Sequence, residues 1–307
     1  MITQAESVCP KLTVSALDGL RGAPRKGLRL VSVGKPMAAE SFIDQRGFCS
    51  TTAAVQQRQD TNMTQHVLLN NIDHQRTRVL HHFSAEYGDN QVSVPVFPTE
   101  FTTLQHEYAI LARHNEQDDS FHAIALLGLA PDENLYLSNN NNGWDARYIP
   151  ALIEKGPFRI GFQQQQTERE AVVHIDLAHP KVNSLHGQQL FLPEGGSSPY
   201  LQHITDTLLR IHQGMALTKP MFDAFRQMQL LQPANIEYSL QNGEKHRLSG
   251  NYCLNTEALA ALRGPELEQL HLAGFLQLAF AMQSSLRHIS SLIERKNQLL
   301  QRLAATA

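Results

Sequence analysis

Residues 63–195 consist of short apolar segments separated by Pro, Gly or Asn, whereas the apolar residues after position 195 follow helical spacing. Short apolar runs that end at turn residues are typical of strands, and apolar residues three and four positions apart are typical of helices. We therefore predict an α+β fold with a mixed or antiparallel sheet in the first half. Helices, a β-hairpin and a long C-terminal helix are expected in the second half.

Two patterns predict strands in the first half. Residues 92–96 alternate valine with other residues up to Pro98, as in a half-buried strand. The apolar run Phe121–Leu129 ends before Pro131, as expected for a strand that is buried on both sides. Further strands are expected at 66–70, Leu135–Leu137, Phe158–Phe162 and Ala171–Leu177, with an Asn-rich turn at 139–143.

Helical spacing and capping residues predict the helices. Phe101, Leu104, Tyr108 and Leu111 lie three and four positions apart, which predicts one helix from Glu100 to about His114. The other expected helices are a short one at 149–155, one that Ser198 caps and that ends at Gly214, one from Thr218 to before Pro233, and a long one from Glu266 to about Leu303.

The hairpin between these helices has two alternative turns. A three-residue turn, Gln241–Gly243, pairs Tyr238 with His246 and Ile236 with Leu248, which keeps one face of the hairpin apolar. A two-residue Asn-Gly turn would set apolar residues opposite charged ones. We predict the three-residue turn, with Gly243 in the left-handed conformation.

The first 62 residues differ in composition from the rest of the chain. All 15 histidines, all seven tyrosines and the single tryptophan follow Met63, and residues 1–62 carry eight Lys/Arg against five Asp/Glu. We expect residues 1–62 to be an unstructured extension or the product of a mis-assigned start, the alternative being a basic tail that contacts a partner. Residues 63–307 are expected to form the α+β domain, with 63–195 and 196–307 as candidate lobes.

Composition excludes several classes of protein. The net charge of −3 and the scattered Lys and Arg do not favour nucleic acid as a partner. The three cysteines lie far apart, so a reducing compartment is expected. The most apolar segment, 272–282, holds 11 residues, and a membrane span needs about 20. Since the N-terminus also lacks the pattern of a secretory signal, we expect a soluble, cytoplasmic protein without a membrane span.

Two residues on a predicted strand are candidate metal ligands. His174 and Asp176 are two positions apart, so both side chains point to the same face of the strand. With a distant second histidine, this pair would resemble the 2-His-1-carboxylate site of non-haem iron oxygenases. The alternative is a structural histidine, and we predict no cofactor for this chain.

A second candidate site is a binding surface formed by Glu100, Trp144, Asp145 and Tyr148. Glu100 lies in a predicted first helical turn, where a carboxylate also complements the helix dipole without any other function. An exposed Trp–Tyr pair is the usual anchor of a contact surface, whereas a buried Trp fills a core. Both alternatives remain open at this point.

Several segments, in this order along the chain, are similar to the bacterial SapC family. They include HVLLNNIDHQRTRVL (66–80), YGDNQVSVPVFPTEF (87–101), ALLGLAPDENLYL (125–137), GWDARYIPALIEKGPF (143–158), NGEKHRLSGNYCLN (242–255) and SLIERKNQ (291–298). The resemblance covers about 240 residues and omits residues 1–62. It is not a resemblance to the peptide-transporter permease of the same name, which spans the membrane.

The resemblance implies a link to surface-layer biology and supplies no catalytic residues. We therefore expect a non-enzymatic binding or accessory protein that acts with neighbouring enzymes or in surface-protein export, with a protein partner. The alternative is an enzyme of unrecognised type, metal-dependent through His174 and Asp176. A weak homodimer through the C-terminal helix is also expected, because apolar residues from Met282 to Leu303 follow a coiled-coil spacing that Lys296 interrupts.

Overall fold

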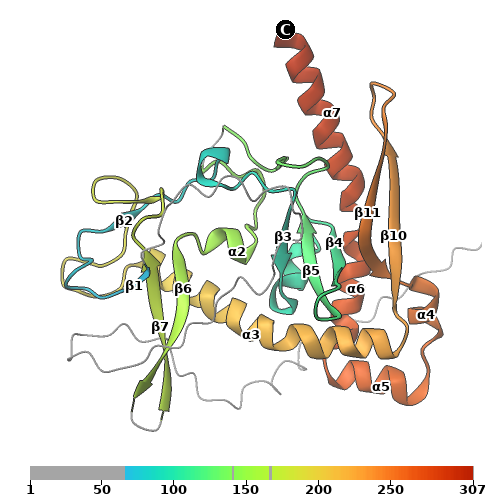
Figure 1. Cartoon of the computed structure of the whole chain (residues 1–307), viewed down its shortest axis with the longest axis horizontal. Coiled ribbons are helices and arrows are strands. Elements are labelled where there is room, and N and C mark those ends of the chain that lie inside the picture. The colour runs from blue at the N-terminus through green and yellow to red at the C-terminus, as the bar shows by residue number, and fades with distance from the viewer. Residues whose placement is uncertain (1–65, 140–141, 166–167, 307) are drawn as a thin grey trace, which may run out of the picture.

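The computed structural model describes residues 66–139, 142–165 and 168–306, and it shows an α+β fold built on antiparallel sheets (Figure 1). This confirms the predicted fold class. The expected extension, residues 1–62, lies outside the described residues. The described helices are α1 (Phe101–Leu104), α2 (Ala151–Glu154), α3 (Pro199–Gln227), α4 (Thr256–Ala261), α5 (Gly264–Leu272), α6 (Phe275–Ser285) and α7 (His288–Thr306), with short 3₁₀ turns η3 (Ala85–Tyr87) and η4 (Pro98–Glu100).

The largest sheet has five strands in the order β10-β11-β4-β5-β3. Its central strands are buried on both faces at residues 110–112 and 123–126, which is why these residues are apolar without alternation. Both predicted strands, at 92–96 and 121–129, are present. The bounds of the five strands are β3 (Ser93–Val96), β4 (Ile110–Asn115), β5 (Ser120–Leu126), β10 (Leu231–Ser239) and β11 (Lys245–Leu254).

The hairpin β10–β11 has the predicted register. Tyr238 pairs with His246, Ile236 pairs with Leu248, and Gly243 adopts a φ of 88°. The hairpin joins β4 through β11, so strands from both candidate lobes, 63–195 and 196–307, belong to one sheet.

A second sheet, with the order β1-β7-β6, packs its own apolar residues in a separate core. The strands predicted at 66–70, 158–162 and 171–177 are therefore confirmed. A small third sheet has the order β8-β2-β9. The bounds are β1 (His66–Leu68), β2 (Arg78–Val79), β6 (Phe158–Gln165), β7 (Glu168–Asp176), β8 (Val182–Asn183) and β9 (Gln188–Gln189).

Helix α3 runs past both sheets and contributes to both cores (Figure 1). It begins as predicted, with the Ser198 hydroxyl accepting a hydrogen bond from the N–H of Leu201 at 3.1 Å. The prediction of two helices, separated at Gly214 and with Thr218 as a cap, was wrong. Gly214 is instead a contact point inside one helix, since a Cβ there would lie 2.4 Å from the Cβ of Phe97. Thr218 donates to the carbonyl of Gly214 within the same helix.

The helix predicted from Glu100 to His114 was also wrong. Only α1 is helical in that range, and β4 begins at Ile110. Phe101, Leu104 and Tyr108 are all buried, but the run from Ala109 to Ala112 is buried on every side. Such a run completes a central strand better than it forms one face of a helix. The strand predicted at Leu135–Leu137 is reduced to a single bridge between Leu137 and Trp144.

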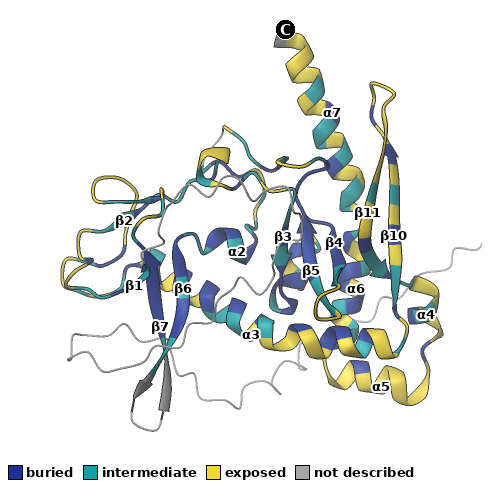
Figure 2. Cartoon of the chain, in the orientation of Figure 1, coloured by how far each residue is buried: buried dark blue, intermediate teal, exposed yellow. Residues whose placement is uncertain are grey.

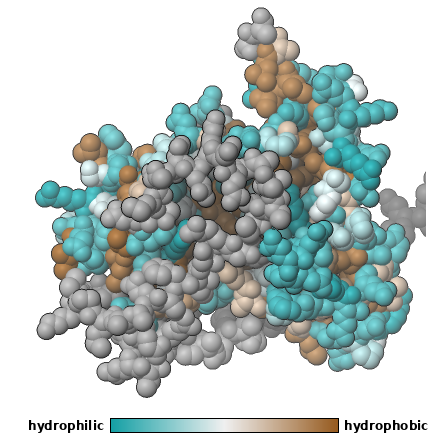
Figure 3. Space-filling model, in the orientation of Figure 1, coloured by the Kyte–Doolittle hydropathy of each residue, from teal (hydrophilic) through white to brown (hydrophobic). Residues whose placement is uncertain are grey.

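The long C-terminal helix is present as α7, and the upstream part of the predicted segment forms α5 and α6 instead. Gly274, at a φ of 74°, separates α5 from α6 because a left-handed residue ends a helix. Ile289, Ile293 and Leu300 of the predicted coiled-coil spacing pack against the chain's own core. The projecting end of α7 is exposed (Figure 2) and carries apolar surface (Figure 3), to which Leu299 and Leu303 contribute. A homodimer through this end stays a prediction.

Within the described ranges, no helix is both long enough and apolar enough to span a bilayer.

Candidate functional site

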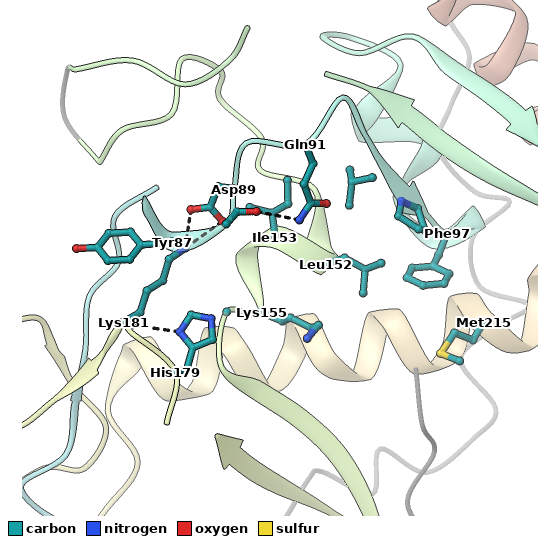
Figure 4. Close-up of a pocket in the computed structure, with 14 residues that line it drawn as sticks. Tyr87, Asp89, Gln91, Phe97, Leu152, Ile153, Lys155, His179, Lys181 and Met215 are labelled. Carbon is teal, nitrogen blue, oxygen red and sulfur yellow. Dashed lines mark hydrogen bonds and ion pairs between the residues drawn. The ribbon is translucent and has the colours of Figure 1, made fainter. Parts of the chain in front are cut away.

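A pocket of about 320 Å³ lies among the segment Tyr87–Phe97, helix α2, the loop after β7 and Met215 of α3 (Figure 4). Its volume is at the lower end of the roughly 300–1,000 Å³ that ligand pockets span. Part of its wall is formed by six apolar side chains, those of Val94, Pro95, Phe97, Leu152, Ile153 and Met215. The polar side chains that reach it are Asp89, Lys155, His179 and Lys181, together with Tyr87 and Gln91.

Lys155 enters the pocket from the C-terminal end of α2. The helix ends there because Gly156 is left-handed, with a φ of 49°, and Pro157 cannot continue a helix. Its ammonium group has one long hydrogen bond, 3.5 Å to the carbonyl oxygen of Phe158, and no ion-pair partner among the described residues. Burial, and secondarily the charge of Arg159, lower the pKa of Lys155 to about 8. This amine is therefore easier to deprotonate than an ordinary lysine.

Lys181, in contrast, is paired. Its Nζ lies 2.9 Å from Oδ2 and 3.2 Å from Oδ1 of Asp89, and both residues are buried. Nζ also lies 4.4 Å from the centre of the Phe83 ring, a cation–π distance. Burial lowers the pKa of Lys181, although Asp89 acts in the opposite direction. The pair joins the turn after η3 to the loop after β7 at one side of the pocket (Figure 4).

His179 is the third basic group of the pocket. Its Nδ1 accepts a hydrogen bond from the backbone N–H of Lys181 at 3.1 Å, so the neutral ring carries its proton on Nε2. Burial, followed by the charge of Lys181, lowers the pKa of His179. The neutral ring is thus favoured near pH 7, and it supplies an N–H donor rather than a charge.

Glu100, which was predicted as a site residue, is buried, and its carboxylate holds nearby backbone groups in place. It is 1% exposed, and its carboxylate accepts hydrogen bonds from the N–H of Phe97, the N–H of Ala151 and the hydroxyl of Tyr148, at 2.9–3.0 Å. It thereby satisfies free N–H groups at the starts of both η4 and α2. Burial raises the pKa of Glu100 in spite of these donors. Glu100 fixes α2, and with α2 it fixes the position of Lys155.

Trp144 is 4% exposed and belongs to the core, which is the packing alternative considered from the sequence. Its ring stacks on Tyr136 with 6.1 Å between centroids, and its Nε1 donates to the hydroxyl of Tyr108 at 2.8 Å. Asp145 is exposed and pairs with Arg295 of α7 at 2.6 Å. The predicted surface is thus divided: Glu100 and Trp144 are buried, and Asp145 and part of Tyr148 face outward. Binding at these two residues stays a prediction.

His174 and Asp176 lie on one face of β7, and both are buried. The His174 ring fills the space beside Gly161 of β6, where a Cβ would come within 2.5 Å of its Cε1 atom. Among the described residues, no three His, Cys, Asp or Glu side chains are grouped to hold a metal ion. The metal-ligand hypothesis for this pair therefore lacks a third ligand in the described part of the chain.

A carboxylate between two histidines borders the pocket region. Oε1 of Glu154 lies 3.1 Å from Nε2 of His81 and 2.8 Å from Nε2 of His203. Burial alone would raise the pKa of Glu154, but the two histidines outweigh it and the pKa is lowered. This group ties α2 to α3 and to the segment after β2, so it supports the same helix that carries Lys155.

Comparison with known families decides where the chain belongs. The model of the SapC family matches residues 69–292, which include the pocket, helices α1–α6 and every strand of the described residues except β1. The chain belongs to the SapC family. Neither the curated proteins nor the solved structures that were searched gave a match to this SapC protein.

The sequence did not single out the pocket residues of this SapC protein. Asp89 and Lys181 are 92 positions apart, and no spacing rule connects them. Asp89 and Lys155 do fall within the segments 87–101 and 143–158 that carry the family resemblance. A lysine that directly precedes Gly-Pro at a helix end was the one local signal available for Lys155.

Proposed function

We propose that this SapC protein is a non-enzymatic binding protein whose pocket holds a small ligand with an apolar body and a head group that accepts hydrogen bonds. The observation that supports this most is the combination, in one pocket, of apolar walls with the amine of Lys155. An amine has three N–H groups to donate when it is charged, and Lys155 uses only one of them, in a long contact. A carboxylate or carbonyl oxygen of the ligand would satisfy the others.

The charges around the pocket favour an electron-rich head group. Asp89 directs both of its oxygens to Lys181, so its charge is already balanced. His179 is neutral at pH 7 and offers Nε2–H as a donor. Among the residues that line the pocket, Lys155 therefore adds the one positive charge that no carboxylate of the described residues balances. An anionic or strongly polarised oxygen is the complement of this arrangement.

The binding role agrees with an accessory protein, as the family resemblance implies. In this proposal the protein is cytoplasmic and presents its ligand to neighbouring enzymes or to surface-protein export. Asp145, which is exposed and pairs with Arg295 of α7, and the partly exposed Tyr148 are the proposed contact residues for a protein partner. Removing Asp145 would free Arg295 on the same surface, so Asp145→Ala is the variant that should lose a partner while the pocket stays intact.

Ligand binding is tested with two probes of equal chain length, octanoate and octanol, titrated into the full-length chain by calorimetry at pH 7. We expect octanoate to bind, and we expect Lys155→Met to weaken octanoate more than octanol. Met215→Trp should fill the pocket and weaken both probes at least tenfold, or about 1.4 kcal/mol. Leu217→Trp, at an exposed position of the same helix, is the matched control. The proposal would be contradicted if Met215→Trp bound octanoate and octanol as tightly as the wild type does.

A further inference from the structure

Lys155 differs from the other lysines of the described residues in its surroundings. Lys181, Lys219 and Lys296 each have a carboxylate partner, namely Asp89, Asp223 and Glu133. Lys245 is exposed on the hairpin. Lys155 and Lys181 both line the pocket, but of the two only Lys155 lacks a carboxylate partner among the described residues, and its one hydrogen bond is 3.5 Å long. Its side chain lies among His179, Leu152 and Met215 (Figure 4).

We propose that Lys155 binds the ligand of this pocket covalently, as a reversible imine with an apolar aldehyde or ketone. This inference rests on the proposed binding function and specifies the head group as a carbonyl. A carbonyl oxygen accepts hydrogen bonds, as the pocket requires, and a carbonyl carbon reacts with a neutral amine. Lysines in apolar surroundings are the ones that form such imines.

The reaction needs no reagent other than the ligand. The lone pair of Nζ attacks the carbonyl carbon, and a proton moves from nitrogen to oxygen to give a carbinolamine. The carbinolamine then loses its hydroxyl group and the second N–H proton as one water molecule, and a C=N bond forms. Water reverses both steps, so the ligand is released unchanged and no group is oxidised or reduced.

The surroundings of Lys155 favour the neutral amine that this reaction requires. The positive charge of Arg159 on β6 lowers the pKa of Lys155. The charge of Lys155 in turn lowers the pKa values of His66 and His179. Lys181 lies in the same pocket with its charge balanced by Asp89. The pKa of Lys155, about 8, leaves a much larger share of this amine neutral at pH 7 than the ordinary lysine pKa of 10.5 would.

The test treats the full-length chain with octanal and sodium cyanoborohydride at pH 7 and locates the adducts by peptide mass mapping. Cyanoborohydride converts an imine into a stable secondary amine whose mass exceeds that of the peptide by octanal less one oxygen. A short peptide with a free α-amine, whose ordinary pKa is about 8, is added to the same sample as the reference for a reactive amine that is not in the pocket. Octanoate is added in parallel samples as a competitor.

We expect the Lys155 peptide to be modified at least tenfold faster than those of Lys219 and Lys245, and octanoate to protect Lys155 but not the added peptide. Lys155→Arg should lose the pocket adduct while the added peptide is still modified, whereas Lys219→Arg should behave like wild type. Equal modification of all lysines, or an adduct that octanoate does not suppress, would overturn the inference. If octanoate binds but no adduct forms at Lys155, the imine is wrong and the binding function stands. If octanoate does not bind and no adduct forms, the binding function is wrong as well.

Discussion

Replacing Gly214 by alanine tests whether α3 is positioned by packing against η4. In an exposed helix interior, Gly→Ala stabilises a protein by about 0.8–1 kcal/mol. At Gly214 the added Cβ would lie 2.4 Å from the Cβ of Phe97 and 2.5 Å from Oγ1 of Thr99. Non-bonded carbon atoms prefer about 3.5–4.0 Å, so the overlap is about 1 Å at two points.

Neither neighbour of Gly214 can move easily. Thr99 donates its hydroxyl proton to the carbonyl of Arg210 on α3 at 3.0 Å, and Phe97 is buried against the same helix. Forcing extra atoms into a packed core costs about 1–3 kcal/mol, and two overlaps place this site in the upper part of that range. After subtraction of the gain in helix propensity, we expect Gly214→Ala to destabilise the protein by about 1–2 kcal/mol.

The measurement is thermal unfolding followed by circular dichroism. One kcal/mol corresponds to about 2–4 °C for a chain of this size, so Gly214→Ala should lower Tm by several degrees. The control is Ala216→Gly, at an exposed position two residues further along α3. This variant should be destabilised only by the lower helix propensity of glycine, which is about 1 kcal/mol. A higher Tm for Gly214→Ala would refute the reasoning, because it would mean that α3 and η4 do not meet as closely as described.

Two further predictions concern the core and the pocket. Trp144→Ala should destabilise the protein by roughly 3–5 kcal/mol. In the wild type, the fluorescence of this single tryptophan should have a short emission wavelength and resist quenchers. A stable variant and a quenchable tryptophan would contradict the burial of Trp144 in the core. For Lys155, lowering the pKa from 10.5 to about 8 corresponds to roughly 3 kcal/mol. The unfolded chain binds more protons than the folded one between these values, so the stability that this residue contributes should rise as pH rises from about 8 to 10.5. Lys155→Met should therefore stabilise the protein at pH 7 in urea titrations, and this advantage should shrink towards pH 10.5; an advantage independent of pH would contradict the lowered pKa.

Local patterns in the sequence were sufficient to predict strands with alternating side chains and a helix start with a capping residue. The hairpin register followed from keeping Ile236, Tyr238 and Leu248 on one face, and the structure has that register. The start of α3 followed from Ser198 and Pro199, because capping depends only on the residues of the first turn. The α+β class followed in the same way, from the order of these local signals.

Only the tertiary structure decided the elements whose local signals are ambiguous. The spacing of Phe101, Leu104 and Tyr108 fits a helix, but Ile110 and Leu111 complete a central strand, because residues from β5 and β11 lie on either side of it. Gly214 resembles a helix end, yet its missing side chain serves contact with Phe97. A glycine that ends a helix and one that allows close packing cannot be told apart without the neighbour.

The candidate pocket depended on the tertiary structure even more. Glu100 was a candidate from the sequence, but its function in holding α2 follows from donors about 50 residues away. Asp89, Lys155, His179 and Lys181 come from separate loops and helix ends, and their pKa values depend on burial and on charges that only folding assembles. The sequence by itself therefore determined which segments are apolar and where many of them turn. The fold decided which lysine lacks a carboxylate partner, because partners and burial arise from contacts between residues far apart in the chain.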